Sequence, residues 1–150
     1  MKKVRVIRRE RFNAAHRLFN PNWTDEKNEL VFGKCSNKNW HGHNFELIVT
    51  VKGKPDPDTG FSYDLKQLGD LIKSEIIDKV DHKNLNLDVD FMEGKLASCE
   101  ILVMEFWKIL APKISAISLA TLGFSAIQTL IVTKIIIPIE ISIIVLVNRL

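Results

Sequence analysis

The segment "HGHNFELIVTV", His41 to Val51, limits the fold more than any other stretch of the sequence. It is rich in β-branched residues, and its apolar residues alternate with others at Phe45, Leu47, Val49 and Val51. Alternation with a period of two places one set of side chains on one face of a β-strand. We therefore predict a strand here whose odd-numbered residues face a hydrophobic core.

The same pattern predicts a strand over residues 4–16, where Phe12, Ala14 and His16 share one parity. Residues 18–34 are polar and contain an early proline, so we predict a loop between the two strands.

Two helices are predicted in the middle of the chain. Apolar residues recur at helical spacing over residues 65–76, with Asp64 and Gln67 placed like a capping box. A second apolar stripe runs over residues 98–111, and we expect Pro112 to end that helix.

The C-terminal part holds two Ile- and Val-rich segments, residues 127–137 and 139–147, which are separated by Pro138 and predict two further strands. The order strand, strand, helix, helix, strand, strand indicates an α+β fold with an antiparallel sheet covered on one face by helices. A chain of 150 residues is expected to form a single domain, residues 1–150.

Charge and composition exclude several classes of protein. The 21 basic and 18 acidic residues nearly balance, so we expect no nucleic-acid partner. The first residues lack the apolar core of a secretory signal, which favours the cytoplasm and two reduced thiols, Cys35 and Cys99. Residues 114–133 are uncharged, but their Ser, Thr and Gln content argues against a membrane span.

The pair His41 and His43 could bind a metal. In an extended chain both rings project from one face, within reach of one Zn²⁺, and Gly42 between them eases the backbone. His16 is the other histidine in a strand-like run, and three histidines with an open fourth position are typical of catalytic zinc sites. The alternative is a set of surface or hydrogen-bonded histidines.

Three further residues could carry chemistry. Cys35 lies six positions before His41, and a thiol near a cation can act as a base or nucleophile. Its alternative role is that of a small buried hydrophobic residue. Asp81 and His82 are adjacent in "VDHKN", although Asp81 could equally be a helix-end or turn residue.

Four motifs occur in a fixed order between about residues 11 and 113: "FNAAHRL", "GKCSNKNWHGHNFELIVTVKG", "DPDTGFSYDL" and "DHKNLNLDV". Together they resemble the 6-pyruvoyl-tetrahydropterin synthase family, which includes the bacterial 6-carboxytetrahydropterin synthases of queuosine biosynthesis. The resemblance implies a tunnelling fold, which is a four-stranded antiparallel sheet with two helices on one face. It also implies assembly through the sheets into homo-trimers or homo-hexamers.

The resemblance further implies the chemistry of the site. The substrate is expected to be 7,8-dihydroneopterin triphosphate, with no redox cofactor or nucleotide required. Cys35 would be the base, and Asp81 with His82 would be the proton relay. The implied Zn²⁺ ligands are His16, His41 and His43.

Two products occur in the family. The Cys-x5-His-Gly-His spacing resembles the pyruvoyl-type enzymes, whereas the Lys-, Ile- and Asn-rich composition looks bacterial. We expect a zinc-dependent lyase that forms 6-carboxy-5,6,7,8-tetrahydropterin, with 6-pyruvoyl-tetrahydropterin and release of triphosphate as the alternative. A zinc hydrolase is a further alternative, because a three-histidine metal can also activate water.

The chain departs from the family pattern near its end. In "SCEIL", Glu100 fits the Glu of the family's "T-x-E-N" motif and is expected to bind substrate, while Cys99 replaces a Thr and Ile101 the Asn. The later "Y-E-T" motif, whose Glu anchors the pterin, has no counterpart in "LIVTKIII". Residues 119–150 therefore suggest a diverged or frame-shifted tail and a catalytically impaired homologue as another alternative. Glu140 could replace the anchor only if its carboxylate lies near the three histidines.

Overall fold

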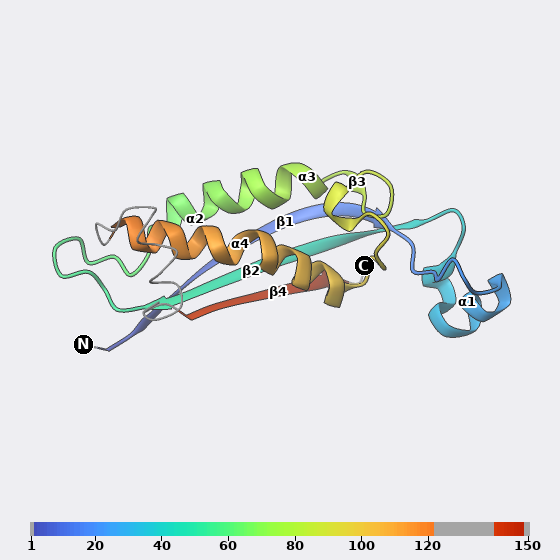
Figure 1. The fold of residues 1–150 in the computed structure, drawn as a ribbon, viewed down its shortest axis with the longest axis horizontal. Helices are drawn as coiled ribbons and strands as arrows, with labels where there is room; N and C mark the ends of the chain where they lie inside the picture. Colours follow the sequence, from blue (N-terminus) through green and yellow to red (C-terminus); the bar gives the residue numbers. More distant parts are fainter. Residues whose placement is uncertain (1, 122–139, 149–150) are drawn as a thin grey trace.

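A sheet and a layer of helices build the protein, whose computed structural model describes residues 2–121 and 140–148 (Figure 1). The sheet has the strand order β3-β1-β2-β4. Its strands are β1 (Val4–His16), β2 (His41–Gly53), β3 (Lys83–Asn84) and β4 (Glu140–Asn148). The helical elements are α1 (Asp25–Phe32), η1 (Gly33–Ser36), α2 (Leu65–Ile72), η2 (Lys73–Ile77), α3 (Asp78–Val80), η3 (Asp90–Met92) and α4 (Cys99–Thr121).

The long strands pair as the sequence predicts. β1 and β2 are antiparallel along their whole length, from Val4 opposite Gly53 to His16 opposite His41. β4 pairs antiparallel with the other edge of β2 and confirms the predicted strand over residues 139–147. The predicted strand over residues 127–137 lies outside the described residues.

The sheet is mixed, which differs from the expected antiparallel arrangement. The two-residue strand β3 runs parallel to β1, with Lys83 opposite Ala14. The N–H groups of His82 and Leu85 donate hydrogen bonds to the carbonyls of Asn13 and Ala15, at 2.6 and 2.8 Å. The chain leaving α3 therefore satisfies backbone groups of β1 that the β1–β2 pairing leaves free.

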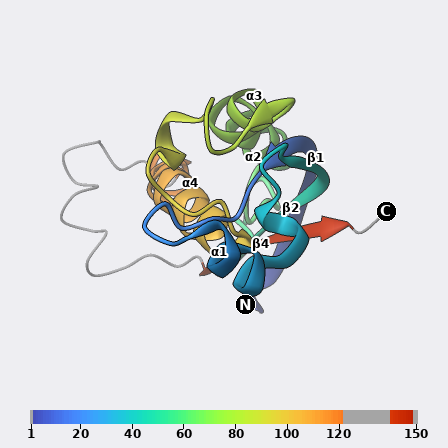
Figure 2. The same cartoon turned by 90° about the vertical axis from the view of Figure 1, so that its right-hand side faces the viewer.

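The core fills the space between the sheet and the helices. Phe12 on β1 and Phe45 on β2 stack with ring centroids 4.8 Å apart, and Phe106 of α4 packs edge-on against Phe12 at 6.2 Å. Both views show α2 and α4 on the same side of the sheet (Figures 1 and 2). Their fully buried side chains are Leu68, Ile72, Leu102, Phe106, Leu110 and Ile114.

The first predicted helix is confirmed and continues through α2, η2 and α3 as far as Val80. The Asp64 side chain accepts hydrogen bonds from the N–H groups of Lys66 and Gln67, at 2.7 and 3.1 Å, and caps this helix as expected.

The second helix corrects the prediction that Pro112 would end it, because α4 continues to Thr121 with Pro112 inside. Proline costs a helix one backbone hydrogen bond. Burial of the turn after Pro112 offsets this cost, because Ile114 is fully buried and Ser115 is nearly so. The hydroxyl of Tyr63 also donates a hydrogen bond to the carbonyl of Ile114 at 3.4 Å.

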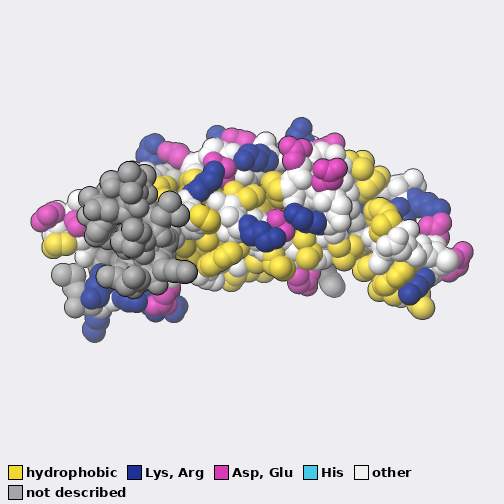
Figure 3. Space-filling view, in the orientation of Figure 1, with side chains coloured by type: hydrophobic (Ala, Val, Ile, Leu, Met, Phe, Trp, Pro, Cys, Tyr) yellow, Lys and Arg dark blue, Asp and Glu magenta, His cyan; other side chains and the backbone are white. Residues whose placement is uncertain are grey.

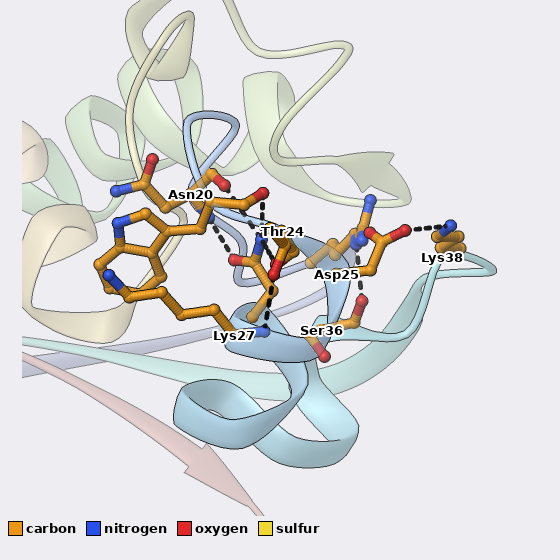
Figure 4. A network of polar contacts seen from close by, with 9 residues as sticks. Asn20, Thr24, Asp25, Lys27, Ser36 and Lys38 are labelled. Carbon is orange, nitrogen blue, oxygen red and sulfur yellow. Dashed lines mark hydrogen bonds and ion pairs between the residues drawn. The ribbon is translucent and has the colours of Figure 1, made fainter.

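Part of the predicted loop over residues 18–34 is the helix α1, which lies beyond the end of the sheet where β1 stops and β2 starts (Figure 1). This helix lacks an apolar stripe, and Leu30 and Val31 are exposed. Polar contacts hold it instead: Thr24 caps the N–H of Lys27 (Figure 4), and the buried Asn28 amide bonds to Asn20.

The surface in Figure 3 mixes acidic, basic and hydrophobic side chains over its described part. Within the residues that the structure describes, no helix is both long enough and apolar enough to cross a membrane. Cys35 and Cys99 are both free thiols, as predicted.

Candidate metal centre

Three histidines meet at the end of the sheet next to α1. His16 is the last residue of β1 and lies opposite His41, the first residue of β2, while His43 lies opposite Ala14. Because all three residues have the parity of the core residues Phe12 and Phe45, their rings share one face. The alternation that builds the core thus also assembles the cluster.

The cluster is tight enough for a single metal ion. One ligand nitrogen from each ring can be chosen so that all three lie within 4.8 Å of one another. The ring centroids of His16 and His41 are 4.5 Å apart, and those of His41 and His43 are 4.7 Å apart. The prediction that these residues come together is confirmed.

The hydrogen bonds of the cluster fit a metal ion. The Nδ1 of His16 lies 2.7 Å from the carbonyl oxygen of Ala97, so Nδ1 carries the proton and Nε2 is left with a free lone pair. His16 Nε2 and both ring nitrogens of His41 are buried without a hydrogen-bond partner. Such orphaned nitrogens are costly unless something binds them. A soft to borderline cation such as Zn²⁺ suits three imidazoles.

Burial also keeps the cluster ready to bind a cation. It lowers the pKa of His16, an effect that the bond to Ala97 partly opposes and that the neighbouring His41 and His43 reinforce. Burial is also the main cause of the lowered pKa of His43. Both rings therefore stay neutral, as metal ligands must be, to lower pH than a free histidine.

Cys35 faces the same region. It sits in the short turn η1 and lines a cavity of about 1050 Å³ together with His41 and His43. The ion pair between Asp25 and Lys38, 2.6 Å long, lies at this cavity (Figure 4). Cys35 is half-buried and so does not belong to the fully buried core.

Asp81 and His82 form a hydrogen-bonded pair at the edge of β1. Asp81 Oδ2 lies 2.9 Å from His82 Nδ1, and Asp81 Oδ1 accepts a hydrogen bond of 2.8 Å from the N–H of Asn13. That backbone bond is the main cause of the lowered pKa of Asp81. The His82 side chain is 77% exposed and its backbone φ is 57°.

The structure does not place this pair against Cys35 within one chain. His82 lines a second cavity, of about 490 Å³, and the two cavities have only His43 in common. His43 is thus the residue that lines both cavities.

Glu100 lines neither cavity. It lies in the first turn of α4, and its pKa is lowered chiefly by its own backbone N–H and also by the hydroxyl of Ser98. A carboxylate at this end of a helix interacts favourably with the helix dipole.

Glu140 lies far from the histidines of its own chain. It opposes Lys52 in the β2–β4 register and forms ion pairs with Lys52 and Lys3, at 2.8 and 3.0 Å. Lys52 is nine residues from His43, which is about 30 Å of strand at roughly 3.3 Å per residue. The hypothesis that Glu140 replaces the pterin anchor is therefore wrong for its own subunit.

Sequence reasoning missed several residues around the cluster. Trp40, with a φ of 63°, turns the chain into β2 and lines the Cys35 cavity. Arg17 lines the same cavity, and its position directly after His16 was the one signal available. The carbonyl of Ala97 could not be foreseen, because a backbone group leaves no mark in the sequence.

Comparisons with known proteins identify relatives of this chain. The family described as 6-pyruvoyl tetrahydropterin synthase matches residues 5–129. A 6-pyruvoyl tetrahydrobiopterin synthase of Pongo abelii is 40% identical over 105 residues, which are 70% of this chain and 72% of that protein. The Homo sapiens protein of the same name is 39% identical over 105 residues, with the same shares of both chains.

A solved structure agrees over nearly the whole length. The Caenorhabditis elegans 6-pyruvoyl tetrahydropterin synthase is similar with a TM-score of 0.70 and 29% identity, covering 99% of this chain and 98% of its own. Its α+β tunnelling fold matches the mixed sheet and helices described above. This chain therefore belongs to the 6-pyruvoyl tetrahydropterin synthase family, a family of lyases.

Proposed function

We propose that the protein is a zinc-dependent lyase that converts 7,8-dihydroneopterin triphosphate to 6-pyruvoyl-tetrahydropterin and releases triphosphate. The observation that carries the proposal is the cluster of three histidines with orphaned buried nitrogens beside the free thiol of Cys35. Membership of this family favours a lyase that acts on a pterin substrate over a zinc hydrolase.

We propose the pyruvoyl product, although the composition of the sequence favours the 6-carboxy product of queuosine biosynthesis. The similar curated proteins carry the pyruvoyl name, and the spacing from Cys35 to His41 resembles that branch. The two products differ in mass, because the carboxy reaction also loses the side chain as a two-carbon aldehyde.

His16, His41 and His43 would hold the metal, since the strands fix their shared face and their ligand nitrogens lie within 4.8 Å of one another. A bound Zn²⁺ supplies a Lewis acid that acidifies neighbouring C–H and O–H groups of the substrate. The Ala97 carbonyl keeps His16 in the tautomer whose Nε2 faces the cluster.

The protein's own groups would move the protons. Cys35 is the proposed base, because it is free and lines the cavity that reaches the histidines. The Asp81 carboxylate holds His82 Nδ1 at 2.9 Å, which leaves Nε2 to exchange a proton as triphosphate leaves. Glu100 remains a proposed substrate ligand only for a pterin that approaches the start of α4.

We also propose that the protein is a homo-oligomer, a trimer or hexamer. The face of the sheet away from the helices exposes Ile7, Ile144 and Leu146, and β4 forms the sheet edge among the described residues. Exposed apolar strands of this kind favour pairing with another chain. Light scattering coupled to size-exclusion chromatography measures the number of subunits, and a monomer would contradict the proposal.

The reaction itself is tested by incubating the zinc-loaded protein with 7,8-dihydroneopterin triphosphate and identifying the products by mass. Cys35→Ala is the key variant, and Cys99→Ala is its matched control. Burial raises the pKa of Cys99, and this thiol lines neither cavity, so the control should keep full activity. Loss of an acid–base group costs about 10²–10⁴-fold in rate, which is the fall expected for Cys35→Ala.

The other outcomes identify the alternatives. A 6-carboxy product would support the queuosine branch. Normal zinc content without turnover of the triphosphate would indicate a catalytically impaired homologue that lacks the pterin anchor. Full activity of Cys35→Ala would contradict the assigned base and favour a zinc hydrolase, whose metal-bound water needs no thiol.

A further inference from the structure

Asn86 holds the backbone of Arg17, the residue that follows His16. The Asn86 Oδ1 accepts a hydrogen bond of 3.0 Å from the N–H of Arg17, and Asn86 Nδ2 donates one of 3.1 Å to its carbonyl. One side chain thereby supplies both bonds that a neighbouring strand would make. It continues the edge of β1 past the last β3 contact, the bond from the Leu85 N–H to the Ala15 carbonyl.

The Arg17 side chain in turn holds the turn that carries Cys35. Its Nε donates a hydrogen bond of 2.7 Å to the carbonyl of Ser36, and its guanidinium lies 4.4 Å over the ring of Phe19. The next residue, Leu18, donates its N–H to the carbonyl of Cys35 at 2.8 Å. Two consecutive carbonyls of the turn are thus fixed by the two residues that follow His16.

These contacts connect three parts of the proposed site. Asn86 belongs to the segment that begins at Asp81–His82, Arg17 is bonded covalently to His16, and Ser36 is bonded covalently to Cys35. Leu30 and Val31 of the intervening α1 are exposed, and Phe32, which precedes the turn, stacks on Trp23 with ring centroids 5.9 Å apart. These contacts do not connect the turn to the end of β1, whereas the hydrogen bonds of Arg17 and Leu18 do.

We propose that Arg17 and Asn86 act together as positioning residues that fix the Cys35 turn relative to the three-histidine cluster. The inference rests on the proposed function where it links this position to turnover, but the position itself can be measured without any activity. Neither residue is assigned contact with the reacting atoms. Their effect passes through the backbone of η1.

The variants are Arg17→Met, which keeps the length of the side chain but removes its donors, Arg17→Lys and Asn86→Ala. Lys66→Met is the control, because it also removes one positive charge, from an exposed ion pair with Asp70 on α2. Each protein is measured for zinc content and for kcat and KM with the triphosphate. Hydrogen exchange is followed at the Leu18 amide and at the Asn37 amide, which donates a hydrogen bond of 3.3 Å to the Lys34 carbonyl within the turn. The double variant Arg17→Met/Asn86→Ala tests whether the two residues act as one unit.

We expect Arg17→Met and Asn86→Ala to speed exchange at Leu18 and Asn37 at least tenfold, with unchanged exchange in β1 and β2 and unchanged zinc content. The kcat should fall about 10–100-fold with little change in KM, because a shift of about 1 Å in a reacting group has effects of that order. Arg17→Lys should recover part of the rate, since one donor can still reach Ser36. The double variant should be no slower than Arg17→Met alone.

Several results would overturn the inference. Unchanged exchange at Leu18 and Asn37 would show that the turn does not depend on Arg17. Loss of zinc with faster exchange throughout the sheet would show a general structural role. A rise in KM without a fall in kcat would make Arg17 a substrate ligand. If the wild-type protein does not turn over the triphosphate, the proposed function fails, and the exchange and zinc measurements alone decide whether Arg17 and Asn86 position the turn.

Discussion

The two ends of the β1–β2 strand pair hold polar groups in opposite situations. At one end, His16 and His41 have buried ring nitrogens without hydrogen-bond partners, although the strands that carry them are fully paired. At the other end, Glu140 is exposed and its carboxylate bonds to Lys3 and Lys52. The histidine end has buried polar atoms that a ligand could bind. At the other end the Glu140 carboxylate already has its partners within the chain.

This difference makes the histidine end the candidate site without reference to any relative. A buried nitrogen with a free lone pair has a cost that only binding can remove, whereas an exposed ion pair needs nothing further. The sequence alone offered both His16 and Glu140 as candidate site residues. The structure distinguishes them, because His16 Nε2 has no hydrogen-bond partner whereas the Glu140 carboxylate has two.

The largest effect is expected from removing one ligand at the histidine end. His43→Ala should abolish stoichiometric zinc binding, because two imidazoles remain and the metal affinity should fall by more than the roughly 10–100-fold that loss of a second-shell partner costs. His43 is only partly buried, so the variant should still fold. Zinc is measured by elemental analysis after dialysis, with Glu140→Gln as the control. Full zinc content in His43→Ala would remove this residue from the cluster.

The second-largest effect is expected from a core substitution in the β1–β2 strand pair, which connects the two ends. Phe45→Ala removes a fully buried ring that stacks on Phe12, and such changes cost about 3–5 kcal/mol of unfolding free energy. The loss should appear in urea unfolding of both the metal-free and the zinc-loaded protein. The exposed Phe61→Ala is the control and should change stability far less. Equal losses in the two variants would mean that β1 and β2 do not form the core that supports the histidines.

The sequence predicted the histidine end better than the rest, for a physical reason. Period-two alternation decides both which face of β2 is buried and where His41 and His43 point, so one local pattern predicts the strand and the site together. Helix α1 escaped prediction because Asn28 stabilises it through hydrogen bonds rather than an apolar stripe. The length of α4 was missed because burial of Ile114 outweighs the local cost of Pro112.

At the histidine end, the stability of the metal-free protein is expected to depend on pH through His16. The pKa of His16 is lowered in the folded state, so below its usual value near 6.5 the unfolded chain binds a proton that the folded chain does not. Stability should therefore fall as the pH drops below about 6.5, until the folded protein is protonated as well. Urea midpoints between pH 7.5 and 5.5 measure this, and His16→Gln should have a shallower dependence. An unchanged slope in that variant would exclude His16 as its source.

The smallest effect is expected from Glu140→Gln at the opposite end. The lysines lower the pKa of this carboxyl to about 2, so its favourable contribution is present above its usual pKa near 4.5 and is lost as the pH falls toward 2. Because the carboxylate is exposed, water and salt screen the ion pairs, and the urea midpoint at pH 7 should move only slightly, with the difference vanishing at high salt. Zinc content should not change at all. A loss of zinc in Glu140→Gln would show that the two ends are coupled through β2 or that Glu140 reaches the histidines of a neighbouring subunit.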